Sequence, residues 1–161
     1  MTSFTIQPFK IDHREWAEHF LSDEWGSLHM VSRGKRYHVL DYPGFVAMVA
    51  EQPQGIITYR VEDTECEVLM LHSAVEGLGI GSALVEQVKQ QAQSAGCHRL
   101  WLITTNDNIH AFRWYQRRGF TIAAVHVNAL AESRKLKPEI PLTGVDGIPL
   151  RDEIEFEMRV S

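Results

Sequence analysis

The stretch from residue 65 to residue 96 constrains the fold of this chain more than any other part of the sequence. It begins with a short apolar run at 68–71 between polar residues, which is typical of a buried strand. Three glycines at alternate positions follow: Gly77, Gly79 and Gly81. Apolar residues then recur at helical spacing: Ile80, Leu84, Val88 and Ala92. Gly96 stands where a helix commonly ends, so the predicted order is strand, glycine turn, helix.

The glycine turn predicts a site for an anion. Glycines let a ligand approach the backbone at the start of the helix, because no side chain stands in the way. The first N–H groups of a helix have no internal partners, and the helix dipole makes this end electropositive. A phosphate or pyrophosphate is therefore the expected ligand. The alternative is a tight turn whose glycines only supply unusual backbone dihedrals.

Three phosphate-binding designs use such a turn, and the neighbouring residues separate them. A P-loop needs a lysine after its last glycine, whereas Ser82 follows Gly81 here. A dinucleotide-binding turn needs glycine or alanine at Ser82 and an acidic residue about twenty residues on, where 99–102 has no carboxylate. A coenzyme A turn reads Gln or Arg, two residues, Gly, one residue, then Gly or Ala. Glu76, Gly79 and Gly81 occupy these positions.

A second motif lies downstream at residues 106–120. It contains Asn108, two residues, Ala111, three residues, Tyr115, three residues and then Gly-Phe. With both motifs present, the chain resembles the GNAT superfamily of acetyl-CoA-dependent N-acetyltransferases. It departs from the family pattern at Glu76, which places a negative charge beside the expected pyrophosphate.

The fold class that this resemblance implies is mixed α/β (α+β) in a single GNAT-like domain over residues 1–161. We expect a central, largely antiparallel sheet of about six to seven strands with helices on both faces. A parallel central pair would be splayed around the cofactor. The length of 161 residues suits one domain with a substantial core. Residues 25–42 have no clean period and are interpreted as irregular, with a second short helix or strand.

The C-terminal part predicts a long insertion before the last strand. Residues 127–151 contain a short helix at 128–137 and then a loop rich in proline and glycine. Because loops of this length are usually functional or disordered, we interpret it as a lid over the acceptor site or a dimer contact. Apolar and charged residues alternate over 153–160, which predicts a strand buried on one face only.

The resemblance implies a cofactor site on the strand and the turn. Backbone groups of the strand would bind the pantetheine arm, and the turn would bind the pyrophosphate. The expected cofactor-binding residues are Leu69, Met70, Leu71, Gly77, Leu78, Gly79, Ile80, Gly81, Ser82, Asn108 and Tyr115. On the sequence alone Asn108 is equally a helix-capping residue.

Tyr115 is the candidate general acid. Acetyl transfer from a thioester to an amine needs a neutral amine, a polarised carbonyl and a proton for the departing thiolate. A phenol with a reference pKa of about 10 can protonate a thiolate whose conjugate acid has a pKa of about 8.5. The family places this acid at Tyr115. The alternative is a core aromatic residue that faces inward with Ile109 and Phe112.

The general base has several candidates. Some relatives place a glutamate at the position of Ile103, which cannot take a proton. Another branch places one near the start of the central strand, which matches Glu65, and Glu67 lies on the same face. His72 titrates in a useful range and ranks third. A solvated strand edge without a base role, and an amine that reacts without a dedicated base, are the alternatives.

Composition excludes several other classes. The net charge of -5 argues against nucleic acid as a partner. No apolar stretch approaches the roughly eighteen residues of a membrane span, and no secretory signal pattern is present, so we expect a cytoplasmic protein without a membrane partner. The eight histidines form no ligand cluster, which predicts no metal. Cys66 and Cys97 are expected to be reduced structural thiols.

The sequence therefore predicts an N-acetyltransferase that takes its acetyl group from acetyl-CoA. The acceptor would be a small-molecule amine or a peptide N-terminus, attacked directly in a ternary complex, and a homodimer is possible. The alternative from another class is a non-catalytic acyl-CoA-binding sensor or interaction module, which the residues at Glu76 and Ile103 favour.

Overall fold

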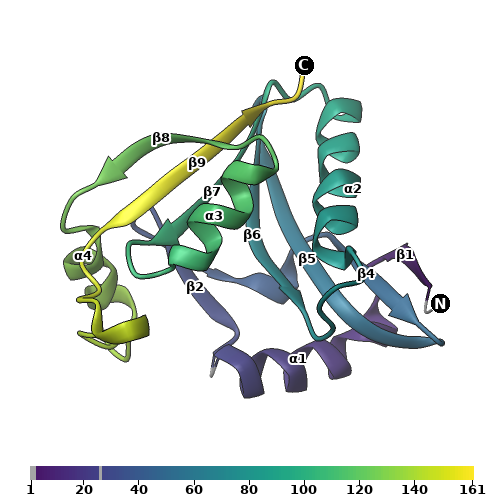
Figure 1. The fold of residues 1–161 in the computed structure, drawn as a ribbon, viewed down its shortest axis with the longest axis horizontal. Coiled ribbons are helices and arrows are strands. Elements are labelled where there is room, and N and C mark those ends of the chain that lie inside the picture. Colours follow the sequence, from purple (N-terminus) through teal and green to yellow (C-terminus); the bar gives the residue numbers. More distant parts are fainter. Residues whose placement is uncertain (1–2, 26) are drawn as a thin grey trace. The chain divides into compact units, whose positions relative to one another are not determined.

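The computed structural model describes residues 3–25 and 27–161 of the chain (Figure 1). These residues form two compact units. The first comprises Met1–His29, His38–Leu100 and Val160–Ser161, and the second comprises Met30–Tyr37 and Trp101–Arg159.

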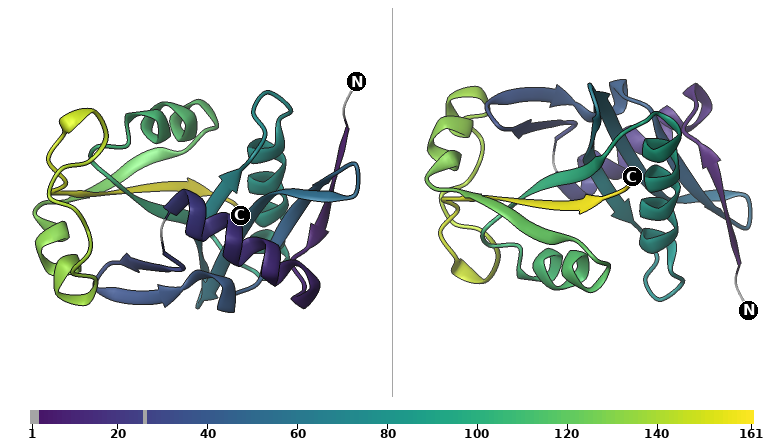
Figure 2. Two further views of the ribbon diagram at one scale, coloured as in Figure 1. Left: turned by 90° about the horizontal axis from the view of Figure 1, so that it is seen from below. Right: turned by 90° about the horizontal axis from the view of Figure 1, so that it is seen from above.

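The first unit is built on four antiparallel strands in the order β1-β4-β5-β6. Their bounds are β1 Phe4–Pro8, β4 Gly44–Val49, β5 Gln52–Glu62 and β6 Glu65–Ser73. The helices of this unit are α1 Ile11–Trp25, the 3-10 helix η1 Val39–Asp41, and α2 Ile80–Ser94. Helices α1 and α2 cover opposite faces of these strands (Figure 2). The predicted helices on both faces are therefore present in this unit.

Helix α2 packs closely on the strands because β5 carries a glycine beneath it. The buried side chains of α2 are Ile80, Leu84, Val85, Val88 and Ala92. A Cβ atom at Gly55 would lie 2.7 Å from Cγ2 of Ile80, which is too short for any side chain at this position. The spacing of apolar residues predicted from the sequence thus corresponds to the buried stripe of the helix.

Strand β7 (Arg99–Thr105) starts beside β6. The amide of His98 donates to the carbonyl of Thr64 at 2.8 Å, and both strands run onward from these residues. They are the parallel pair of an otherwise mostly antiparallel sheet, to which seven strands are assigned. The predicted mixed α/β class with six to seven strands is confirmed.

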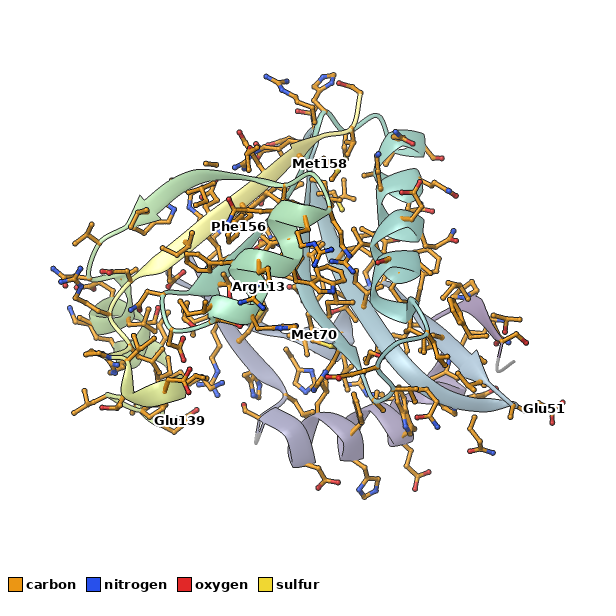
Figure 3. The ribbon with its side chains drawn as sticks, viewed as in Figure 1. Glu51, Met70, Arg113, Glu139, Phe156 and Met158 are labelled. Atoms are coloured by element: carbon orange, nitrogen blue, oxygen red, sulfur yellow. The ribbon has the colours of Figure 1, made fainter. Side chains whose placement is uncertain are left out.

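The second unit contains β7, the antiparallel pair β8 (Thr121–His126) and β9 (Glu153–Arg159), and two helices. The helices are α3 Ile109–Arg117 and α4 Ala129–Leu136, with a 3-10 turn η2 at Val145–Gly147. Strand β9 lies between β7 and β8. Phe156 on β9 lies beside α3 (Figure 3), where its ring meets that of Phe112 edge-on at 5.4 Å.

The segment predicted to be irregular contains a β-hairpin. Strands β2 (His29–Ser32) and β3 (Lys35–His38) form a separate two-stranded sheet. The turn residues Arg33 and Gly34 have φ values of 50° and 78°. Two successive left-handed residues are the geometry of the tight turn that suits a two-residue hairpin loop.

The prediction that the last strand is buried on one face only is wrong. Glu153 and Glu155 are 3% and 6% exposed, although they alternate with the buried residues Ile154 and Phe156. The glutamate face is covered by segments distant in the sequence, because Ser133 of α4 contacts Glu153 and Arg33 lies 3.8 Å from Glu155.

Candidate active site

The glycine turn lies between β6 and α2 and has the open backbone that the sequence predicts. Gly77 and Gly79 have φ values of 82° and 81°, which side chains rarely tolerate. A Cβ atom added to either glycine would meet no atom within 4 Å among the described residues. Gly79 is the N-cap of α2 and makes no side-chain cap bond. The start of the helix thus offers amide groups and the positive end of its dipole to an anion.

The other turn residues support this geometry. Ser73 starts the turn, since its hydroxyl donates to the carbonyl of Val75 at 2.7 Å. Gly81 lies in the first turn of α2, and its φ is not positive. A left-handed backbone conformation therefore does not explain the glycine at this position. Leu78 and Ser82 are half-buried, and Glu76 is exposed.

Strand β6 contains a bulge at Leu69. In the register with β5, Val68 pairs with Tyr59 and Met70 pairs with Thr58, so Leu69 has no opposite residue. An extra residue of this kind interrupts the ladder and leaves backbone groups unpaired by the neighbouring strand. The bulge falls in the 69–71 segment that the resemblance assigns to the pantetheine arm. Met70 of this segment is buried on β6 (Figure 3).

Both candidate glutamate bases on β6 have an arginine beside them. Glu67 is 1% exposed, and its Oε1 accepts from Nε of Arg60 at 2.8 Å. Glu65 is exposed, with Oε1 3.4 Å from a terminal nitrogen of Arg99. A proton on either carboxylate would weaken its ion pair. Two residues on one strand face, as predicted, therefore differ strongly in burial.

His72 is engaged through one ring nitrogen. Its Nδ1 accepts from the amide of Ser73 at 3.1 Å, so the neutral ring carries its proton on Nε2. The ring contacts Phe20 of α1 at a centroid distance of 5.0 Å.

The second motif forms helix α3 in the second unit. Oδ1 of Asn108 accepts from the amide of Ala111 at 3.1 Å, and its Nδ2 donates to Oγ1 of Thr104. Asn108 is thus the N-cap of α3, which is one of the two roles predicted for it.

Tyr115 lies within an aromatic group in the same unit. Its ring meets those of Trp114 and Phe120 edge-on at 5.0 and 5.3 Å, and Phe156 lies at 6.1 Å. Burial raises the pKa of the phenol well above its ordinary value, and the charge of Arg118 opposes this only partly. The hydroxyl therefore keeps its proton at neutral pH, as a general acid must.

The insertion is tied to the residues just before α3. Oδ1 of Asn106 accepts from the amides of Arg151 and Asp152, both at 3.0 Å. Oδ2 of the buried Asp107 accepts from the amide of Val145 at 2.9 Å. A Cβ atom at Gly144 would lie 2.1 Å from this oxygen, so only glycine allows the loop to approach. The insertion is thus an ordered part of the second unit.

Sequence reasoning missed the polar contacts of two buried glutamates on β9. Glu153 contacts the buried Ser133, and Glu155 lies beside the half-buried His126 and the exposed Arg33. No pattern in the sequence marks them, because alternating glutamates on a last strand are typical of a solvent-facing surface.

Three further results concern metals, membranes and cysteines. Among the described residues, no three His, Cys, Asp or Glu side chains are grouped closely enough to hold a metal ion. Across the same residues, no helix combines the length and apolar character that a membrane span requires. Cys66 and Cys97 are both free and buried.

Comparison with known proteins identifies the family. The model of the acetyltransferase (GNAT) family matches residues 10–120, which is more than half of the chain. The chain belongs to this family. Its general activity is therefore acetyl transfer from acetyl-CoA.

Individual relatives agree with this assignment. The chain is 43% identical over 152 residues to the uncharacterized protein YdhI of Bacillus subtilis, covering 91% of this chain and 94% of the relative. Its fold is similar to an IAA acetyltransferase from Bacillus cereus, with a TM-score of 0.73, 20% identity and coverage of 98% and 99%. A GNAT family acetyltransferase from Elizabethkingia anophelis with acetyl-CoA bound is similar with a TM-score of 0.69, 18% identity and coverage of 97% of each chain.

Proposed function

We propose that this chain moves an acetyl group from acetyl-CoA to a primary amine by direct attack in a ternary complex. The observation that carries the proposal is the turn before α2. Gly77 and Gly79 hold left-handed dihedrals there, with open space beside them. This arrangement suits a pyrophosphate at the helix N-terminus. The bulge at Leu69 supports the pantetheine role of residues 69–71.

In the proposed reaction the amine nitrogen attacks the thioester carbonyl and the C–S bond then breaks. Tyr115 donates its phenolic proton to the departing sulfur, and the amine loses a proton to solvent or to a base. Burial raises the pKa of Tyr115, so the phenol holds that proton at neutral pH. The candidate bases are Glu67, Glu65 and His72. Direct proton transfer to either glutamate requires that the ion pair with its arginine breaks.

The remaining proposals concern the chain as a whole. Residues 1–161 act as one acetyltransferase-like domain, and the 127–151 insertion serves as a lid over the acceptor site or as a contact in a homodimer. The acceptor is a small-molecule amine or a peptide N-terminus. The ordered bonds of the insertion to Asn106 and Asp107 support a defined role for it.

Gly79→Ala tests the cofactor turn, and Gly96→Ala is its matched control. Both glycines have left-handed dihedrals, at φ values of 81° and 78°, and open space for a Cβ atom, but they lie at opposite ends of α2. Both changes should therefore cost similar stability. Calorimetry should show a loss of acetyl-CoA affinity of about tenfold or more, or about 1.4 kcal/mol, for Gly79→Ala alone. Equal affinities in the two folded variants would contradict the proposed site.

Tyr115→Phe separates an enzyme from a sensor. The change keeps the ring contacts and removes the proton donor, so kcat should fall about a hundred-fold to ten-thousand-fold while acetyl-CoA affinity stays the same. Tyr59→Phe is the control, because Tyr59 is also a buried tyrosine whose pKa is raised by burial. A Tyr115→Phe variant with wild-type kcat would eliminate the general-acid role.

The sensor is the second candidate function. It is favoured by one observation: the two glutamates among the candidate bases, Glu65 and Glu67, both form ion pairs with arginines. A panel of amines that releases no coenzyme A from bound acetyl-CoA would support this alternative.

A further inference from the structure

Strand β8 is an edge strand of the second unit. It pairs with β9 on one side and stands last in the strand order, so no described strand pairs with its other side (Figure 1). An edge of this kind presents a row of backbone N–H and C=O groups that can pair with another chain. The side chains of β8 therefore decide whether its edge stays in solvent or forms an interface.

The exposed side chains at this edge are largely apolar. Ile122, Val125 and Val127 are 48%, 53% and 65% exposed. Residues 119–131 contain no Asp, Glu, Lys or Arg, and this is the longest stretch of the chain without them. Edge strands that remain in solvent usually carry charged residues or proline, which prevent pairing with other chains. The stretch around β8 has neither.

The opposite end of the strand order has the usual protection. Strand β1 has five residues, ends at Pro8 and exposes Thr5, Gln7 and Pro8, while its larger apolar side chains are half-buried. The charged Lys10 follows two residues later. The edge at β1 is thus typical of a strand that faces solvent, whereas the edge at β8 is not.

One protecting feature is present in β8, and it limits the part that can pair. The register with β9 skips Ala123, which forms a bulge between Ile122 and Ala124. From Ala124 through His126 the register is regular. The ring of His126 is engaged within the unit, because its Nε2 lies 2.9 Å from Oε1 of Glu155 on β9. This regular segment is therefore the part of the edge that suits a further strand.

We propose that β8 pairs with β8 of a second copy of this chain in an antiparallel arrangement. An interface with two-fold symmetry uses the same surface on both copies, and an antiparallel pair of identical strands meets this condition. The inference concerns assembly and does not depend on the acetyltransferase activity.

Charge favours a second copy as the occupant. The chain has a net charge of -5, so two copies repel each other least where charged side chains are absent, as they are at 119–131. A charged peptide would find no oppositely charged side chain on this strand. Apolar side chains such as Val125 would instead meet the same apolar side chains of the other copy, as cross-strand pairs do within a sheet.

Sedimentation equilibrium of the full chain tests the proposal with two valine variants. Val125→Lys places a charge on the edge of both copies, so the dimer dissociation constant should rise about a hundredfold or more. Val61→Lys is the matched control, because Val61 is also a strand residue, is 43% exposed and lies on β5, which has a strand on each side. This control should keep the wild-type dissociation constant.

Leu142→Lys tests the insertion, which is the other surface proposed for a homodimer. Leu142 is 75% exposed, and its replacement should leave the dissociation constant within about twofold of the wild type. A dimer that persists in Val125→Lys, or that Leu142→Lys disrupts, would overturn the assignment to β8. A wild-type chain that remains monomeric at about 0.1 mM would also overturn it and leave the edge to a different strand-donating partner or to solvent.

Cysteine cross-linking gives a readout that introduces no charge. In an antiparallel pair, opposite residues have Cα atoms about 4.5–5.5 Å apart, which a disulfide can bridge. Single cysteines placed in turn at 121–127 should therefore give a disulfide-linked dimer at the position on the two-fold axis and much less at its neighbours. The native Cys66 and Cys97 are buried, so the wild type provides the background. Background levels of cross-linking at every position would overturn the proposed pairing.

Discussion

Two buried glutamates, one in each unit, have opposite surroundings. Glu67 on β6 is 1% exposed and has Nε of Arg60 2.8 Å from its carboxylate. Glu153 on β9 is 3% exposed and has the neutral hydroxyl of Ser133 instead. Two carboxylates that are buried to a similar extent therefore differ in whether a charged group accompanies them.

The difference follows from how each partner is supplied. Arg60 lies directly opposite Glu67 in the β5–β6 register, so the two strands that bury the carboxylate also neutralise it. The charge of Glu67 is therefore compensated within the β5–β6 hairpin itself. On β9, by contrast, Arg33 lies beside Glu155, 3.8 Å from its Oε1. The side chain of Glu153 has only the neutral hydroxyl of Ser133 as a hydrogen-bond partner among the described residues.

The largest effect is expected for Arg60→Met. Removing one partner of a buried ion pair leaves the charge of Glu67 uncompensated, which typically costs about 3–5 kcal/mol of unfolding free energy. Urea denaturation measures the loss. The double variant Arg60→Met with Glu67→Met should recover most of it, because both charges are then absent. A loss below about 1 kcal/mol for the single variant would mean that the pair is not the partner that Glu67 requires.

A smaller loss is expected for Ser133→Ala. This change removes the hydrogen bond on Oε1 of Glu153, and hydrogen bonds to charged groups contribute about 1.5–3 kcal/mol. A double-mutant cycle with Glu153→Gln, followed by urea denaturation, measures the coupling between the two residues. Additive losses would show that Ser133 does not support the carboxylate.

A buried group that is neutral at pH 7, the thiol of Cys66, should behave differently from the two glutamates. Burial raises the pKa of the Cys66 thiol to about 12, with Cys97 and Glu67 adding to the shift and Arg60 opposing it. The unfolded chain loses the thiol proton above an ordinary pKa of about 8.5, whereas the folded chain keeps it. The stability is therefore complete below about pH 8.5 and declines as the pH rises toward 12.

Urea denaturation between pH 8 and 10 measures this slope, which for one thiol is at most about 1.4 kcal/mol per pH unit. Burial also raises the pKa of Cys97, so both thiols contribute. Cys66→Ala should reduce the slope without removing it. An unchanged slope in this variant would mean that Cys66 ionises equally in both states.

The smallest effect is expected on the exposed face of α4. Lys135 lies 3.1 Å from Glu132, but the side chains are 72% and 71% exposed. Exposed pairs contribute about 0–1 kcal/mol, so Glu132→Gln should change the unfolding free energy by less than about 0.5 kcal/mol. A larger change would show that even exposed charges near Ser133 affect the unfolding free energy. Burial would then not explain why charged groups differ in their contribution to stability.

Local signals in the sequence were sufficient for the central strand, turn and helix. The glycines at 77 and 79 have the left-handed dihedrals that their spacing suggests, and the apolar positions of α2 are the buried ones. These features depend on neighbours within a few residues. The sequence did not predict the hairpin of β2 and β3, because its turn is Arg33-Gly34 and its strands are only four residues each.

The sequence by itself determined the family and predicted the cofactor turn and the candidate acid, because each depends on short spacings such as that from Asn108 to Tyr115. The tertiary structure alone decided which carboxylates are buried and what accompanies them. Glu65, Glu67, Glu153 and Glu155 all alternate along strands in the same way, and nothing in that alternation distinguishes them. Their surroundings differ because burial and charge compensation come from residues distant in the sequence, such as Ser133 and Arg33.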